Sequence, residues 1–141
     1  MENQPNFEEQ LYQFRYLKEQ RVNLQGQLDF ARVYLNTLLS TKKTLDSIKD
    51  GVNVDDEILV PIGGLVNIKA SIKDTEKFLV TLGQDTLIEK NLDESIEYVE
   101  ARITRQNENT KLLIEEIQKL DVYLQGISQN LQNNYNQIRK Q

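Results

Sequence analysis

ILVPIGGLVNIKA, at residues 58–70, interrupts a chain that is otherwise rich in charged and amide side chains. Apolar runs stand on both sides of Gly63 and Gly64, a pattern that predicts two β-strands joined by a glycine turn. Two further apolar runs, at 78–82 and 86–89, follow with a turn of their own. The sequence therefore predicts two consecutive β-hairpins in the middle of the chain.

The strands of these hairpins are too apolar to face water alone, and isolated two-stranded hairpins are marginally stable. We expect them to be buried against copies of themselves or a partner's strands. A β-barrel is the favoured arrangement, because closure removes exposed strand edges. The residues expected to carry this assembly are Ile58, Val60, Ile62, Val66, Ile68, Phe78, Val80, Leu82, Leu87 and Ile88.

The segments on either side repeat apolar residues at alternating spacings of three and four, the heptad pattern of a coiled coil. Nine of twelve heptad positions are apolar between Phe7 and Leu45, and eleven of fourteen between Leu92 and Ile138. The two helices are of nearly equal length, about 70 Å each, as a helical hairpin requires. The predicted fold is mainly α with a small β part: an antiparallel helical-hairpin coiled coil with two central β-hairpins that oligomerise into a β-barrel. The expected division is residues 1–50, 51–91 and 92–141, with helix ends marked by Asn6, Gly51 and Asn91.

An antiparallel pairing of these helices places opposite one another residues whose numbers sum to about 143. Four interior positions of the predicted seam are then polar: Arg21, Lys42, Gln106 and Thr110. Two interpretations remain open for them. Their long stems snorkel and fix the register, or they loosen the coil locally, as glycines at 26 and 126 would also do.

The free ends of the two helices are the candidate binding surface. Seam packing is the default interpretation of Phe7, Phe14, Leu131 and Ile138. Leu11, Tyr12 and Tyr135 fall outside the strict seam, so they are better candidates for apolar surface that a client could reach. Together these seven residues are the predicted client-binding tips.

Composition argues against several other functions. The chain has no Cys and no His, which excludes disulfides, the usual zinc sites and the commonest general base. A net charge of −5 disfavours a nucleic-acid partner. No apolar stretch is long enough to span a membrane, and Met1–Pro5 lacks the features of a signal peptide, so we expect a soluble cytoplasmic protein without a membrane partner.

The motifs that could carry chemistry are weak. Gly63-Gly64 lacks the Lys-Ser/Thr and the strand-to-helix flanks of a phosphate loop. The acidic run at residues 55–57 lacks the alternating ligand spacing of a calcium loop, and adjacent carboxylates such as Glu115 and Glu116 diverge on a helix. We therefore expect no enzyme, no catalytic residue, no cofactor and no metal.

The hairpin region resembles a known family. Ile58-Leu59-Val60-Pro61-Ile62-Gly63-Gly64, followed by residues 69–77 and a strand ending Glu89-Lys90, closely resembles the alpha-type subunit of archaeal prefoldin. The resemblance covers the whole order of helix, two hairpins and helix. It implies a hexamer in which two alpha-type and four beta-type subunits build a β-barrel platform with six coiled-coil tentacles. It also implies that the tentacle tips capture unfolded proteins without ATP and pass them to a group II chaperonin.

The chain departs from the family pattern at two turns. Leu65 stands where the family usually has a third glycine, and Gly83-Gln84-Asp85 replaces a Gly-Ala-Gly type of turn. Both turns lie in the hairpins that choose assembly partners. The alternative is therefore an alpha-like paralogue that assembles with copies of itself, into a larger ring, a filament or an architectural coiled-coil scaffold.

Overall fold

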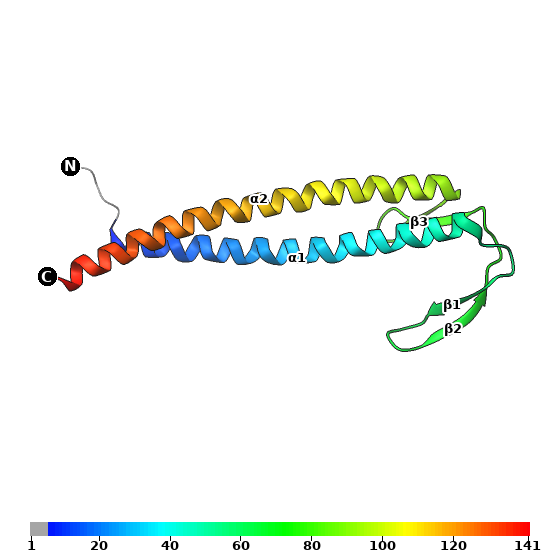
Figure 1. Ribbon diagram of the computed structural model, residues 1–141, viewed down its shortest axis with the longest axis horizontal. Coiled ribbons are helices and arrows are strands. Elements are labelled where there is room, and N and C mark those ends of the chain that lie inside the picture. Colours follow the sequence, from blue (N-terminus) through cyan, green and yellow to red (C-terminus); the bar gives the residue numbers. More distant parts are fainter. Residues whose placement is uncertain (1–5) are drawn as a thin grey trace. The chain divides into compact units, whose positions relative to one another are not determined.

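The computed structural model describes residues 6–141, which form two long helices separated by four short strands (Figure 1). The helices are α1, Phe7–Gly51, and α2, Leu92–Arg139. The strands are β1, Glu57–Pro61; β2, Asn67–Ser71; β3, Phe78–Thr81; and β4, Leu87–Lys90. This order of helix, two hairpins and helix is the one that the sequence predicts.

The chain divides into two compact units, each containing part of both helices. One unit is Met1–Tyr34 together with Gln106–Gln141, and it holds the start of α1 and the end of α2. The other unit is Leu35–Arg105, and it holds the remaining helix turns and both hairpins. We call the first the shaft unit and the second the hairpin unit.

The helix ends lie where their capping residues predict. Asn91 caps α2: its Oδ1 accepts the backbone N–H of Glu94 at 2.8 Å, and its Nδ2 donates to Oε1 of Glu94 at 3.2 Å. Such reciprocal bonds satisfy donors that the first helical turn leaves unpaired. α1 ends at Gly51, whose φ of +151° is a conformation that residues with a side chain rarely adopt.

The heptad seam is confirmed by burial. All twelve predicted seam positions of α1 are buried or half-buried, and so are those of α2 with the exception of Ile138. Ser95, Ile96 and Val99 are buried in the hairpin unit. The core of the shaft unit consists of Leu28, Ala31, Leu113 and Ile117, with Leu24 and Ile114 packed against it. Apolar burial along one narrow stripe is thus the main force that holds the two helices together.

The predicted register is also confirmed. Pairs of polar side chains join the helices in both units: Arg21–Asp121 and Gln10–Asn134 in the shaft unit, and Lys42–Glu100 and Lys49–Asp93 in the hairpin unit. The residue numbers of each pair sum to 142 or 144, close to the expected 143. The hydrogen bond and the charge of Asp93 raise the pKa of Lys49, and Asp121 raises the pKa of Arg21 in the same way.

The polar seam residues mostly have partners. Arg21 donates from Nε and Nη2 to the two carboxylate oxygens of Asp121, and Nε2 of Gln106 donates to the carbonyl of Ala31 at 3.2 Å. Thr110 is the exception among residues 6–141, because its shielded Oγ1 has no hydrogen-bond partner. These pairings favour the interpretation in which polar seam residues fix the register.

Both predicted hairpins form, each as a two-stranded antiparallel sheet. The first turn is wider than predicted: the strands stop at Pro61 and resume at Asn67, and the N–H of Ile62 donates to the carbonyl of Val66 at 2.9 Å. In the connection between the hairpins, the carboxylate of Asp74 accepts two backbone N–H groups, from Glu76 at 2.8 Å and Lys77 at 3.1 Å. These bonds lower the pKa of Asp74.

Candidate functional site

The predicted tip residues are brought together at the free ends of the helices. The first turns of α1, blue in Figure 1, lie beside the last turns of α2, red in the same view. Nδ2 of Asn134 donates to Oε1 of Gln10 at 3.2 Å, which ties the two ends to one another. We call the seven residues Phe7, Leu11, Tyr12, Phe14, Leu131, Tyr135 and Ile138 the tip surface.

The tip surface contains both packed and exposed side chains. Phe7, Phe14 and Leu131 are half-buried, as their seam positions predict. Tyr12 is 74% exposed and Tyr135 is 57% exposed, as expected for positions outside the seam. These two rings are therefore available to a binding partner.

Two tip residues differ from the prediction. Leu11, expected outside the seam, is half-buried, whereas Ile138, expected inside it, is 63% exposed. The register explains the exposure of Ile138, because the residue opposite it would lie at or before the start of α1. The apolar seam therefore ends at about Asn134, and Ile138 adds to the exposed apolar area at the free end.

The first hairpin has one apolar face and one mixed face. Its pairing places Ile58 across from Ala70 and Val60 across from Ile68, and the bond between Ile62 and Val66 extends the same row. The opposite face carries Leu59 and the ion pair between Glu57 and Lys69, whose N and O atoms lie 3.7 Å apart. Among residues 6–141, all of β1 and all of β2 except half-buried Ala70 are exposed, so both faces of this sheet remain largely open.

The second hairpin is partly covered. Phe78, Val80 and Ile88 alternate as half-buried residues with exposed Leu79 and Leu87. The hydroxyl of Tyr98 in α2 donates to the carbonyl of Thr81 at 3.4 Å, and the ammonium of Lys90 lies 5.8 Å from the centre of the Tyr98 ring. The two hairpins therefore differ: the second is tied to the first turns of α2, and the first presents a free apolar face.

The acidic run at residues 55–57 is used to close the first hairpin. The carboxylate of Asp56 accepts the backbone N–H of Asn53 at 2.8 Å, and Glu57 is paired with Lys69. Within residues 6–141 no cluster of three or more acidic side chains could hold a metal ion. Over the same residues, no helix is long and apolar enough to cross a membrane.

An exposed row of aromatic residues on α1 was missed in the sequence. Tyr12, Tyr16, Phe30 and Tyr34 fall within a sector of about 40° on the helix, at about 100° per residue, and all four are exposed. Tyr123 of α2 joins Tyr16 in the lining of one surface hollow. We call the four α1 residues the aromatic stripe. Their spacing of four and fourteen residues could have revealed the row, which lies outside the heptad seam.

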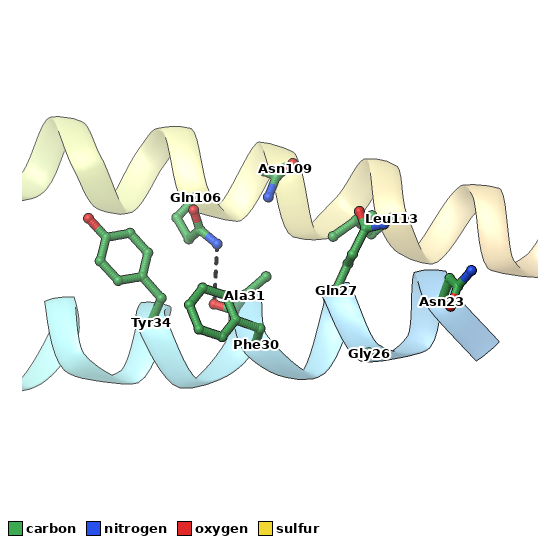
Figure 2. A pocket seen from close by; sticks show the side chains of 9 residues that line it. All are labelled: Asn23, Gly26, Gln27, Phe30, Ala31, Tyr34, Gln106, Asn109 and Leu113. Carbon is green, nitrogen blue, oxygen red and sulfur yellow. Dashed lines mark hydrogen bonds between the residues drawn. The ribbon is translucent and has the colours of Figure 1, made fainter. Parts of the chain in front are cut away.

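A larger hollow lies along the shaft unit between the two helices, and we call it the shaft hollow (Figure 2). Its volume is about 750 Å³. Figure 2 shows the rings of Phe30 and Tyr34 rising from α1, and Gln106 reaching from α2 to the carbonyl of Ala31. The full lining is Asn23, Gly26, Gln27, Phe30, Ala31, Tyr34, Gln106, Asn109 and Leu113.

Two long paired helices joined through two β-hairpins define a coiled-coil protein with a small β part. Comparison with known proteins agrees with this class. The family described as "Prefoldin subunit" matches residues 17–137. The chain belongs to the prefoldin family.

Several relatives carry the same family name. "Prefoldin subunit alpha 1" of Thermococcus kodakarensis is 35% identical over 102 residues, which are 72% of this chain and 69% of that protein. "Prefoldin subunit alpha" of Archaeoglobus fulgidus is 27% identical over 131 residues, 93% of this chain and 95% of that protein. As a prefoldin subunit, the chain is a chaperone component and not an enzyme.

A solved structure supports the fold. The filamentous prefoldin of Methanocaldococcus jannaschii, determined by cryo-electron microscopy, superposes with a TM-score of 0.69 at 22% sequence identity. The match covers 81% of this chain and 93% of that one. The order of helix, two hairpins and helix is therefore a known prefoldin architecture.

Proposed function

We propose that the chain is a subunit of an ATP-independent holdase, which captures unfolded polypeptide on the tip surface and delivers it to a group II chaperonin. The observation that carries the proposal is the exposure of Tyr12, Tyr135 and Ile138 at the free helix ends of a prefoldin-family chain. Large apolar side chains exposed together mark a binding surface. We place this activity in the cytoplasm, where chaperones meet newly made chains.

The size of the tip surface suits weak and reversible binding. Three large side chains, about two-thirds exposed, offer roughly 400 Å² of surface, if each carries about 200 Å². A stable protein interface needs about 800 Å² on each partner. One tip therefore holds an unfolded chain weakly, whereas several tips on one assembly make later contacts intramolecular and raise the overall affinity by about 10²–10⁴.

Assembly through the hairpins supplies the several tips. In our proposal, residues 51–91 form the assembly part and residues 1–50 and 92–141 form the arm. The free apolar face of the first hairpin packs against strands of beta-type prefoldin subunits or of other copies, closing a β-barrel. This proposal is supported by the row of Ile58, Val60 and Ile68, whose side chains remain 37–52% exposed among residues 6–141.

Self-assembly into a filament or scaffold is a second candidate. Leu65, at the turn of the first hairpin, is 97% exposed. A leucine so exposed is hardly packed against the other residues of 6–141, and it suits insertion into a neighbouring copy. The solved prefoldin that resembles this fold is itself described as filamentous. In this candidate the same strands assemble, and a client at the tips is not required.

Removing the ends tests the first candidate. A shortened chain spanning residues 10–129 loses Phe7, Leu131, Tyr135 and Ile138 but keeps both hairpins. We expect it to sediment as the full-length assembly does and to lose binding of a fluorescently labelled unfolded protein. If the shortened chain no longer assembles, the ends are structural parts of the seam.

Point substitutions separate binding from structure. Tyr12→Ser combined with Tyr135→Ser should weaken binding of the unfolded protein, since both rings are exposed and their loss leaves the seam intact. Val122→Ser removes an exposed apolar side chain elsewhere on α2 and is the matched control. Equal binding by the double variant and the control would overturn the role of the tips.

A further inference from the structure

The shaft hollow has an unusual lining for this chain. None of its nine residues is charged, although charged residues make up 28% of the sequence. Asn23, Gln27 and Asn109 contribute side-chain amides that can both donate and accept hydrogen bonds. Gln106 contributes a fourth amide, whose Nε2 already donates to the carbonyl of Ala31. A polypeptide backbone offers the same two kinds of group at every residue. The lining thus combines groups that match a backbone with aromatic rings that accept apolar side chains.

The hollow has room for a short extended segment. Asn23 and Tyr34, at its two ends along α1, are separated by about 16 Å of helix at about 1.5 Å per residue. An extended chain covers that distance with about five residues. The volume of about 750 Å³ lies in the range of sites that bind small molecules and peptides. The space beside Gly26 is open, because a Cβ atom built there would meet nothing within 4 Å.

The chemistry of the lining and the exposed area of its rings indicate which kind of molecule the shaft hollow can bind. A nucleic acid or another polyanion would require Lys and Arg in the lining, and there are none. A second copy of this chain would require about 800 Å². Phe30 is 76% exposed and Tyr34 is less exposed, so their rings together offer roughly 250 Å². An extended, apolar polypeptide segment that is held weakly fits both the uncharged lining and the small exposed area.

The hollow also continues the proposed tip surface. Tyr12 belongs to the tip surface, and Tyr16, Phe30 and Tyr34 follow it along the same face of α1. The aromatic stripe therefore provides apolar contacts next to the tip surface, at Tyr12 and Tyr16, and again at the hollow, at Phe30 and Tyr34, about 21 Å of helix further on. All four residues of the aromatic stripe lie in the shaft unit.

We propose that the shaft hollow is a second binding site for an extended segment of unfolded polypeptide, which reaches it along the aromatic stripe from the tip surface. This inference rests on the proposed holdase function. It predicts that one arm holds two parts of the same unfolded chain. Because the second contact is intramolecular, filling the hollow should weaken binding of long unfolded chains even with the tips intact.

Filling the hollow is the first test. Gly26→Leu projects a side chain into the open space, and Gly126→Leu is a matched control, because a Cβ atom at either glycine meets nothing within 4 Å and only Gly26 lines the hollow. Both changes replace a helical glycine by a better helix former. The assembled protein is titrated into fluorescein-labelled, reduced and carboxymethylated α-lactalbumin, and binding is followed by anisotropy.

We expect Gly26→Leu to raise the Kd by about three- to tenfold and Gly126→Leu to leave it within about twofold. Phe30→Ser, which removes an exposed ring and leaves the seam unchanged, should act like Gly26→Leu. If Gly26→Leu and Phe30→Ser both bind as the unchanged protein does, the hollow is only a gap in packing and the inference is overturned.

Photo-crosslinking gives a direct second test. The photoreactive residue p-benzoylphenylalanine replaces Phe30 in one variant, Tyr12 in a second and Val122 in a third. Crosslinks to α-lactalbumin from positions 12 and 30, and not from 122, support the inference. Crosslinks from position 12 alone overturn it and leave the holdase proposal standing. Absence of crosslinks and of anisotropy change with every variant contradicts the holdase proposal itself.

Discussion

The free apolar face of the first hairpin leads to a sharp prediction about assembly. Val60 lies in the middle of that face, directly across from Ile68. It is partly exposed within its own chain, so a glutamate at this position can reach water and the protomer should still fold. In an assembly that buries this face, Val60→Glu places a carboxylate among apolar side chains.

The loss of association free energy can be estimated from how far residue 60 is buried in the assembly. Burying the remaining third of a valine side chain is worth up to about 1 kcal/mol, and a carboxylate left without a partner in an apolar interface costs about 3 kcal/mol or more. The sum of about 4 kcal/mol for each interface lowers the association constant by roughly 10³. At micromolar protein concentration such a loss should shift the population from assembly to protomer.

Sedimentation velocity at about 10 µM measures the shift, and circular dichroism checks that the helices are retained. Leu59→Glu is the matched control, because it introduces the same charge at the neighbouring residue on the opposite, mixed face. We expect Val60→Glu to sediment near the 16.4 kDa of one chain and Leu59→Glu to remain assembled. Assembly of Val60→Glu, or equal dissociation of both variants, would refute the assignment of the buried face.

Two further predictions concern stability. Leu28→Ala should lower the free energy of unfolding by about 2–4 kcal/mol in urea denaturation, since Leu28 is 4% exposed in the core of the shaft unit. Val22 is exposed, so Val22→Ala should change the free energy of unfolding by less than about 0.5 kcal/mol. Backbone hydrogen bonds lower the pKa of Asp74 in the folded chain. Its contribution to the stability of the fold is therefore fully present above its ordinary pKa near 3.8, and it is lost as the pH falls through the lowered pKa of the folded chain. The protection of these two amides against hydrogen exchange, relative to the intrinsic rate at each pH, should therefore fall in that acidic range, and Asp74→Asn should abolish this pH dependence of the protection.

The helices could be predicted from the sequence because a heptad pattern records which side of a helix is buried. Each interruption of the pattern by Arg21, Lys42 or Gln106 has a polar partner in the structure. The ends followed from capping chemistry at Asn91 and Gly51. Local signals of this kind need no knowledge of distant parts of the chain.

Features that depend on three-dimensional position were predicted less well. The exposure of Ile138 depends on where α1 starts, which lies about 130 residues away in the sequence. The second hairpin is partly covered and the first is not, and this difference depends on Tyr98 of α2. The contact of Tyr98 with Thr81 cannot be read from the sequence pattern of the strands. The shaft hollow arises from a small residue, Gly26, and from polar side chains across two helices, so no single segment encodes it.

The proposed function requires that assembled chains hold unfolded polypeptide without nucleotide. Its most direct test adds the purified protein, alone or assembled with a beta-type prefoldin subunit, to a chemically unfolded client diluted into buffer without ATP, and follows light scattering. We predict that near-stoichiometric amounts of assembled protein suppress aggregation, and that the chain shortened to residues 10–129 does not. Scattering that is unchanged by either assembly would contradict the account and favour a purely architectural coiled coil.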